Sequence, residues 1–273
     1  MDFILICISD QKYKCMNQLI TGILLQLSLF ACNNNSITPA ISLINETPAF
    51  NNFYTQIKKI PLPGGFERAA ADSASFTSYL RNIGLKKDKT VYLFNGRPKN
   101  NQLAQFALLN ISTGNTDLQQ CADAVIRLRA EYLFAQKQFD QIIFYDNDKT
   151  AYKFLYPYSR DNFNKYLNRV FGMCGSASLS KQLKRVSDFK NIQAGDVIIR
   201  GGFPGHAVMV MDVAVNVWGK KMYLLAQSYM PAQDIHVLVN LANAAVSPWY
   251  EVNEDEIIIT PEYTFTKNEL RSW

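Results

Sequence analysis

The chain has 273 residues, of which 48% are hydrophobic, and a formal net charge of +5. This length holds one large domain or two small ones. Basic and acidic residues are interspersed without a long Lys/Arg block, which argues against nucleic acid as a partner. The sequence also lacks a repeat of fixed period, and after the N-terminal region no apolar run reaches the roughly 18–20 residues that span a bilayer.

The N-terminus has the pattern of an export signal. Lys12 and Lys14 precede a short apolar run that ends at Cys32. A basic patch followed by a short apolar run and a small residue is typical of a secretory signal. The last four residues, Leu29-Phe30-Ala31-Cys32, resemble a bacterial lipobox, which implies cleavage after Ala31 and a lipid on Cys32. An ordinary signal peptide that happens to contain a cysteine is the alternative.

These features divide the chain into three predicted parts. Residues 1–31 are a lipoprotein signal peptide, residues 32–60 are a flexible tether rich in Asn, Thr and Pro, and residues 61–273 form one domain. The expected location is the bacterial cell envelope, at the outer membrane or on the periplasmic face, where the N-terminal lipid holds the protein on the membrane.

Two cysteines are left for the mature domain. Cys7 and Cys15 leave with the signal, and Cys32 carries the lipid, so Cys121 and Cys174 remain. In an exported domain two cysteines can form one disulfide, which makes a purely structural lipoprotein one open hypothesis. With two cysteines and two histidines the chain is short of ligands for a structural zinc site, and we predict no metal and no cofactor.

Helices are expected first and strands last along the domain. The strongest helix covers residues 117–137, where Asp117 is the expected N-cap and Gln120 completes a capping-box pattern. Cys121 then lies near the start of this helix and faces inward. The other expected helices are 73–85, 159–172 and 178–186, and the expected strands are 90–96, 103–112, 141–146, 196–200, 206–214, 221–229, 234–240 and 255–261. This order predicts an α+β fold with an antiparallel sheet.

Three residues have the chemistry of a thiol hydrolase. A thiol nucleophile needs a base within hydrogen-bond reach, and the base needs a group that orients it. The start of a helix lowers the pKa of a thiol, which favours Cys121 as nucleophile. His206 opens a strand after Gly-Phe-Pro-Gly, a segment whose low bulk can leave a face open to substrate. A hairpin centred between Asn216 and Val217 sets Gln227 opposite His206, where it can hold the imidazole tautomer.

The segment from Gly195 to Val213 resembles NlpC-type papain-like cysteine peptidases and CHAP-type amidases. In both, Gly-Asp opens one strand and a histidine opens the next. The resemblance implies a papain-like fold, with the sheet packed against the helix that carries Cys121, and the order Cys121, His206, Gln227 for the catalytic residues. The chain departs from the pattern in having Gln120 before the cysteine and Gln as third residue.

A closer resemblance covers nearly the whole mature chain. The blocks around Cys121, His206 and Gln227, together with Ser247-Pro248-Trp249-Tyr250-Glu251, resemble an uncharacterised bacterial lipoprotein family, DUF 4846. This resemblance implies no activity.

The sequence therefore leaves several functions open. We expect a cell-envelope peptidase or amidase, acting on a peptide or on peptidoglycan, with Cys121 as nucleophile and His206 as base. Gln120, Tyr229 and Gln233 are the candidates for the substrate cleft. His236 is expected to be structural, with a substrate or orienting role as the alternative. The alternatives are a non-catalytic envelope lipoprotein that binds a ligand on the same fold and the disulfide-bonded structural protein.

Overall fold

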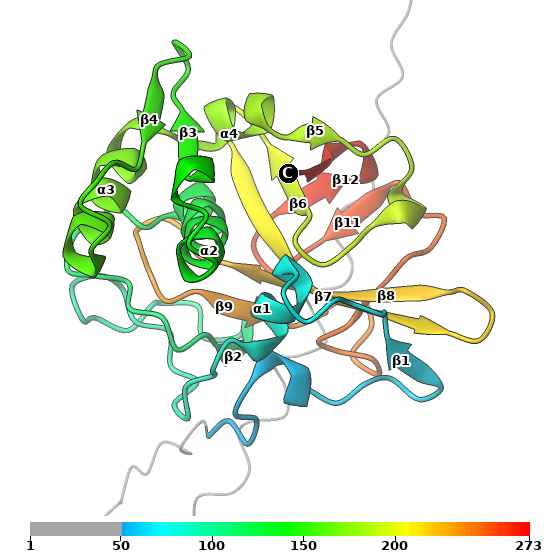
Figure 1. Cartoon of the computed structure of the whole chain (residues 1–273). Helices are drawn as coiled ribbons and strands as arrows, with labels where there is room; N and C mark the ends of the chain where they lie inside the picture. The colour runs from blue at the N-terminus through cyan, green and yellow to red at the C-terminus, as the bar shows by residue number, and fades with distance from the viewer. Residues whose placement is uncertain (1–50) are drawn as a thin grey trace, which may run out of the picture. The chain divides into compact units, whose positions relative to one another are not determined.

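The computed structural model describes residues 51–273 (Figure 1). The predicted signal peptide and Cys32 lie outside these residues. The described part contains four α-helices: α1 (Phe76–Asn82), α2 (Cys121–Ala135), α3 (Arg160–Met173) and α4 (Ser176–Gln182). Its strands are β1 (Phe66–Arg68), β2 (Gln105–Leu108), β3 (Ile143–Tyr145), β4 (Ala151–Lys153), β5 (Lys184–Arg185), β6 (Val197–Arg200), β7 (His206–Asn216), β8 (Lys221–Gln227), β9 (His236–Leu238), β10 (Tyr250–Glu251), β11 (Ile257–Ile259), β12 (Thr264–Thr266) and β13 (Leu270–Ser272).

Nine of these strands form one sheet in the order β2-β9-β8-β7-β6-β13-β5, with β1 also pairing β7 and β10 pairing β8. Every pairing in it is antiparallel. The prediction of an α+β fold with a large antiparallel sheet is confirmed. Strands β7 and β8 are long neighbours near the centre of the strand order. His206 is the first residue of β7, and Gln227 is the last residue of β8.

The two faces of the sheet are covered differently. On one face Ala207, Met209 and Met211 of β7 belong to a core that includes the apolar residues of all four helices. On the other face Val208 and Val210 pack with Phe265 and Ile258 of the β11–β12 hairpin (Figure 1). Because side chains alternate along a strand, residues 206–211 of β7 meet the helices or the hairpin in turn, and the alternation changes phase at Asp212.

Helix α2 begins at Cys121, later than the expected start. Gln120 is the N-cap, and its backbone N–H donates to Asp123 Oδ2 at 2.9 Å. Asp117 does not cap the helix; its Oδ1 accepts a hydrogen bond from the Ala232 backbone N–H at 2.6 Å. The prediction for Asp117 was therefore wrong, because tertiary pairing with the segment after β8 uses its carboxylate. The shift places Cys121 at the first helical position.

Strand β7 contains a bulge that sets the environment of His206. Val213 pairs with Tyr223, but after the irregularity between Val210 and Asp212 the register slips by one residue, and Val210 pairs with Leu225. Continuing this register sets Gln227 opposite Val208, two residues from His206 and on the same face. Without the extra residue, Gln227 and His206 would point to opposite faces. The predicted hairpin register was thus displaced by two residues, which preserved the predicted side.

The part of the predicted tether that the structure describes, residues 51–60, is packed against the domain. Ile57 and Ile60 are buried in the core of the helix-covered face, and the Ile57 backbone N–H donates to Ile83 O at 3.1 Å. The tether boundary at residue 60 was therefore too late, because these two isoleucines fill the core beneath α1.

Most other expected elements are present, and the expected strand at residues 90–96 departs from the prediction. Residues 90–96 form no strand; they make the expected turn, in which the Gly96 N–H donates to Leu93 O at 2.9 Å and Gly96 has φ +78°. Both described thiols, Cys121 and Cys174, are free and buried. Within residues 51–273, every helix is too short or too polar to cross a membrane.

Candidate active site

His206 and Gln227 meet on the hairpin-covered face of the sheet. His206 Nε2 lies 2.7 Å from Gln227 Oε1, and both side chains are buried. The predicted pairing of these two residues is present in the structure. It arises as a diagonal contact between neighbouring strands, because the bulge in β7 brings both side chains to one face.

The amide of Gln227 has one possible orientation. Its Nε2 donates to Glu262 Oε2 at 2.8 Å and also lies 3.5 Å from His236 Nε2. A carboxylate only accepts hydrogen bonds, so the nitrogen of the amide must face Glu262 and the oxygen must face His206. This orientation follows from the neighbours of the amide and does not depend on telling oxygen from nitrogen.

The two histidines are therefore held as opposite tautomers. His206 donates from Nε2 to the oxygen of Gln227, which leaves Nδ1 of the neutral ring as an acceptor. His236 Nδ1 lies 2.8 Å from Asp234 O, a carbonyl that only accepts, so His236 carries its proton on Nδ1. Within residues 51–273 no hydrogen bond is made by His206 Nδ1, and this nitrogen is the one free to take a proton.

Aromatic rings surround His206 and exclude water from its imidazole. Its ring centroid lies 4.7 Å from that of Tyr229, 5.0 Å from Tyr263 and 5.7 Å from Phe265. Burial disfavours the charged imidazolium and lowers the pKa of His206 to about 4, against the raising effect of the Gln227 hydrogen bond. His206 is consequently neutral at pH 7 in this state.

Cys121 is also buried and neutral, contrary to the expectation from its place in the helix. Burial, and after it the charge of Asp123, raises the pKa of the Cys121 thiol to about 11. Backbone N–H groups of Ala122, Ala207 and Cys121 act in the opposite direction but are outweighed. The field at the start of a helix is therefore not enough to form a thiolate when the sulfur is desolvated.

The Cys121 sulfur lies next to the strand that carries the base. The backbone N–H of Ala207, the residue after His206, is one of the groups that favour its thiolate. No hydrogen bond joins the thiol to the imidazole among the described residues. Cys121 thus lies beside the backbone of the residue that follows His206 at the start of β7, and its thiol is not hydrogen-bonded to the imidazole.

A buried ion pair completes the polar cluster around Gln227. Lys99 Nζ lies 2.5 Å from Glu262 Oε2, and Asn101 Nδ2 donates to Glu262 Oε1 at 3.1 Å. The side chains of Lys99 and Glu262 are only 9% and 12% exposed. Burial lowers the pKa of Lys99, and the hydrogen bond to Glu262 opposes this shift. Sequence reasoning missed Glu262 and Lys99, because both lie in irregular segments far from the cysteine and histidine motifs.

The family model for Domain of unknown function (4846) matches residues 57–156 and 146–272. The chain belongs to this family. No curated protein and no solved structure matches the chain. The family assignment from the sequence blocks is confirmed, and the first matched residue agrees with the packing of Ile57 into the core.

The three cleft candidates of this family member lie in different surroundings. Tyr229 is half-buried against the His206 ring, and Gln120 is half-buried at the start of α2. Gln233 is 1% exposed, forms a bridge with Leu93, and has no hydrogen-bond partner for Nε2 among the described residues. Tyr229 and Gln120 can meet a ligand near Cys121, whereas Gln233 is packed inside the domain and cannot line an open cleft.

The glycine-rich loop before His206 packs closely against the start of α4. A Cβ on Gly205 would lie 2.3 Å from both Gly202 O and Ser176 Oγ, so the loop approaches the start of α4 too closely for any side chain. Phe203, at the tip of this loop, is 95% exposed. Gly205 therefore serves the close packing of this loop on α4.

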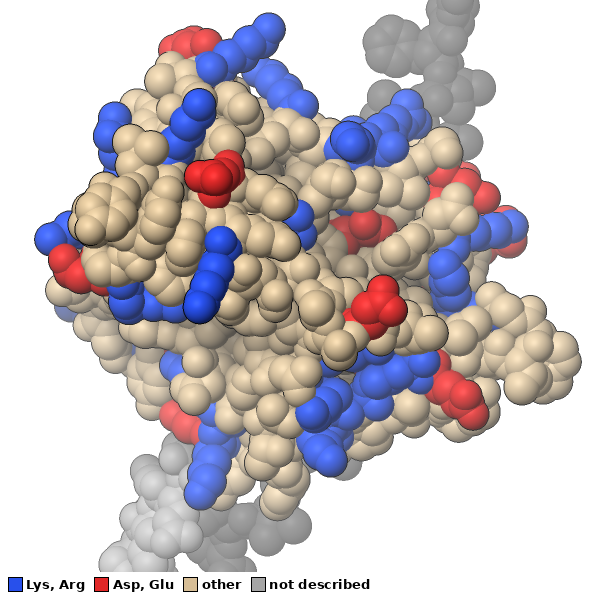
Figure 2. Space-filling model, viewed as in Figure 1, with Lys and Arg blue, Asp and Glu red and all other residues tan. Residues whose placement is uncertain are grey.

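The surface near the site offers neither a metal cluster nor a single-sign patch. Among the described residues no three His, Cys, Asp or Glu side chains are grouped to hold a metal ion. On the face shown in Figure 2, Lys/Arg and Asp/Glu side chains are interspersed.

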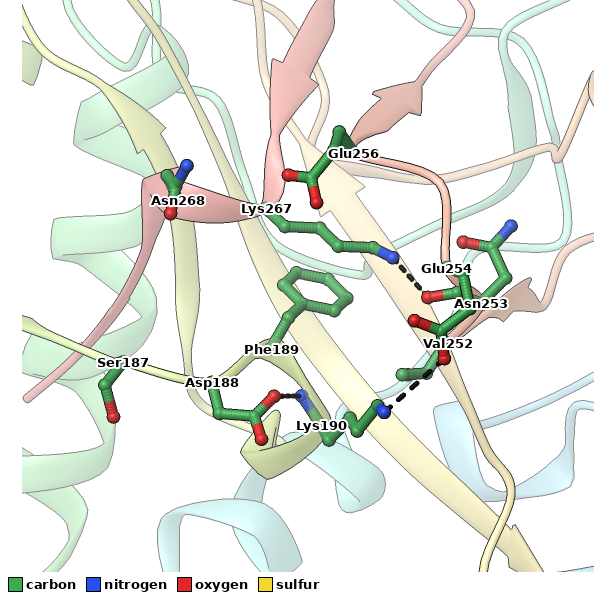
Figure 3. A pocket seen from close by; sticks show the side chains of 10 residues that line it. All are labelled: Ser187, Asp188, Phe189, Lys190, Val252, Asn253, Glu254, Glu256, Lys267 and Asn268. Carbon is green, nitrogen blue, oxygen red and sulfur yellow. Dashed lines mark hydrogen bonds and ion pairs between the residues drawn. The ribbon is translucent and has the colours of Figure 1, made fainter.

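A polar hollow of about 270 Å³ lies between the Phe189 turn and the segment before β11 (Figure 3). In it, Lys190 Nζ lies 3.4 Å from Glu254 Oε1, and Lys267 Nζ donates to the backbone carbonyl of Asn253. None of the candidate site residues lines it. We therefore place the candidate site at Cys121 and His206 and not in this hollow.

Proposed function

We propose that the domain is a papain-like thiol hydrolase, a peptidase or amidase of the bacterial cell envelope. Cys121 is the nucleophile, His206 the base and Gln227 the residue that orients the base. The observation that carries the proposal is the 2.7 Å contact between His206 Nε2 and Gln227 Oε1, with the amide direction fixed by Glu262. An imidazole whose Nε2 proton is held by a side-chain oxygen presents Nδ1 as the base, which is what a thiol nucleophile at the start of a helix needs.

The proposed reaction moves one proton and exchanges one acyl bond at a time. The thiol proton passes from Cys121 Sγ to His206 Nδ1 while sulfur bonds to the substrate carbonyl carbon and the carbonyl electron pair moves to oxygen. Free N–H groups at the start of α2 are the donors available to that oxyanion. His206 then protonates the leaving amine as the C–N bond breaks. Water then gives one proton to Nδ1 and its oxygen bonds to the thioester carbon; as the C–S bond breaks and the acid leaves, the Cys121 sulfur takes that proton back from Nδ1.

Burial gives this site a closed resting state. Cys121 is 7% exposed and His206 is 2% exposed, so a substrate carbonyl reaches the sulfur only if neighbouring side chains move. Tyr229 is the half-buried cover over His206, and it is followed by Met230, which is 51% exposed. We propose that the segment from Tyr229 to Pro231 opens to admit an acyl substrate such as a peptidoglycan peptide.

Location enters the proposal through the N-terminus. The lipobox-like ending at Cys32 supports a lipid anchor and an envelope substrate, and it lies outside the described residues. Polymeric peptidoglycan is available to a lipoprotein held on a bacterial membrane, which is why we prefer it to a free peptide.

A second candidate function is a non-catalytic ligand-binding lipoprotein on the same frame. It is favoured by the thiol itself, since burial and Asp123 raise the pKa of Cys121 to about 11 and little thiolate exists at neutral pH. The disulfide-bonded structural form is not supported, because Cys121 and Cys174 are both free.

Alkylation of the two thiols separates the candidates. The full-length chain is treated with iodoacetamide between pH 5 and pH 9, and the modified cysteine is identified by mass spectrometry. Cys174 is the control thiol, because it is equally buried and burial raises its pKa to about 12 without a histidine beside it. If the domain is a hydrolase, iodoacetamide should modify Cys121 about a hundredfold faster than Cys174 near pH 7. This factor is the lower end of the rate gain that a positioned base contributes.

The same measurement on His206→Ala decides the role of the base. In a folded mutant the rate at Cys121 should fall to that at Cys174. If both thiols of the unmodified chain react at the same slow rate, and rise together only at high pH, the binding candidate is correct and Cys121 is a core residue.

A further inference from the structure

We propose that Glu262 and His236 are positioning residues that fix the amide of Gln227 and thereby hold His206 with its proton on Nε2. The inference concerns the resting protein, and its catalytic meaning rests on the function proposed above. Neither residue belongs to the Cys121, His206 and Gln227 set, and for His236 the sequence favoured a structural role over a substrate or orienting role.

The first half of the lock is Glu262. Its Oε2 accepts from Gln227 Nε2 at 2.8 Å, and its other oxygen accepts from Asn101 at 3.1 Å. Lys99 Nζ at 2.5 Å supplies the positive charge that a buried carboxylate requires. An ionised carboxylate has no proton to donate, so a flipped Gln227 would direct its oxygen at Glu262 with no hydrogen between them.

The second half of the lock is His236, which is fully buried on β9. The carbonyl of Asp234 takes its Nδ1 proton at 2.8 Å, and burial lowers the pKa of His236, so the ring is neutral. Its Nε2 is then a bare lone pair, and it lies 3.5 Å from Gln227 Nε2. Both neighbours of the amide nitrogen are therefore acceptors, and both oppose the flipped amide.

The consequence for His206 is a forced tautomer. With the amide fixed, only the oxygen of Gln227 faces His206, and the neutral ring must donate from Nε2. The alternative, with the amide reversed, would place a donor against His206 Nε2, move the ring proton to Nδ1 and remove the lone pair that a base needs. Glu262 and His236 thus act on the base without contacting substrate.

The chain is well suited to a direct test, because it contains only two histidines. Two-bond ¹H–¹⁵N correlation spectra of the ¹⁵N-labelled full-length chain at pH 7 report the tautomer of each ring. We expect one ring protonated at Nε2 and one at Nδ1, and His206→Ala should remove the first. A His206 ring protonated at Nδ1 in the unmodified chain would overturn the inference.

Glu262→Gln tests the lock itself. Glutamine keeps the shape of glutamate and adds an N–H donor, so the Gln227 amide can turn over and direct its Oε1 at residue 262. The His206 ring nitrogens should shift toward values of a tautomer mixture. Glu131→Gln is the matched control, since Glu131, whose side chain is 13% exposed, also forms an ion pair, with Arg127 at 2.9 Å, and does not contact Gln227. It should leave both rings unmoved.

Unmoved His206 resonances in a folded Glu262→Gln chain would refute the positioning role. If this variant does not fold, the spectrum of the unmodified chain still decides the tautomer. The spectra do not require catalytic turnover. If Cys121 is unreactive and the tautomers are as expected, only the hydrolase proposal is rejected. If Cys121 is reactive and the tautomers differ from those expected, only this inference is rejected.

Discussion

Replacing Asp212 by Asn should weaken the strand that carries His206. Asp212 is fully buried at the bulge of β7, and its two oxygens accept from Arg81 Nε at 2.6 Å and Arg68 Nε at 2.7 Å. Oδ1 also accepts from the Val213 backbone N–H at 2.9 Å. One carboxylate therefore joins β7 to β1 and α1 at the residue where the register slips.

The expected magnitude follows from these contacts. Asparagine keeps one acceptor oxygen but no charge, so at most one arginine keeps its hydrogen bond and both partly buried arginines lose their counter-charge. Removing one partner of a buried ion pair costs about 3–5 kcal/mol, and the partial exposure of the arginines (22% and 12%) favours the lower end. We expect a loss of about 3 kcal/mol in the free energy of unfolding, or roughly 6–12 °C in Tm for a domain of this size.

Urea denaturation at pH 7, followed by circular dichroism, measures this loss directly. Asp161→Asn is the matched control, because the Asp161–Lys165 pair is exposed on α3 (side chains 77% and 73%) and should contribute less than about 0.5 kcal/mol. A loss below about 1 kcal/mol for Asp212→Asn would refute the argument that this carboxylate holds the bulge, and would indicate that packing alone sets the register.

Two further predictions concern other parts of the chain. Cys32→Ser should release the full-length protein from bacterial membranes into the soluble fraction, and a variant that still resists alkaline extraction would disprove the lipid anchor. Asp196 lies at the start of β6, and burial raises its pKa from 3.8 to about 6. A carboxyl with a raised pKa contributes stability that is present below about pH 4 and lost as the pH rises through 6. Asp196→Asn should therefore abolish a decline of about 2–3 kcal/mol in unfolding free energy between pH 4 and pH 7, and equal pH profiles for both chains would contradict it.

The sequence predicted the elements whose patterns are local. The apolar periodicity of α2 and the strand runs of β7 and β8 gave the correct elements, and the hairpin between the strands brought His206 and Gln227 to one face. The register was still displaced by two residues. The turn lies nearer to Gly219, at φ +78°, than expected, and the bulge changes the pairing after Val210. The two deviations together shift the register by an even number of residues. His206 and Gln227 therefore still share a face, although they are not directly opposite each other.

The remainder of the site depends on contacts that no local pattern records. Glu262 follows a proline in the β11–β12 turn, and Lys99 lies in an irregular segment, yet they meet across 163 positions of sequence. The pKa of Cys121 was expected to be lowered by the helix start and is raised instead, because desolvation depends on everything packed around the sulfur. The N-cap of α2 also differs from the prediction because of a tertiary contact. Asp117 accepts a hydrogen bond from the Ala232 backbone N–H and does not cap the helix.

The geometry of His206 depends on contacts that lie far from its ring. Arg68 and Arg81 hold Asp212 at the bulge, and the bulge turns His206 toward Gln227 and away from the helix-covered face. Glu262 and His236 then fix the amide, and the amide fixes the ring proton. A related chain with the same cysteine, histidine and glutamine but no extra residue in this strand would point its histidine to the other face. In this chain, the residue count between His206 and the β7–β8 turn therefore decides whether His206 and Gln227 share a face.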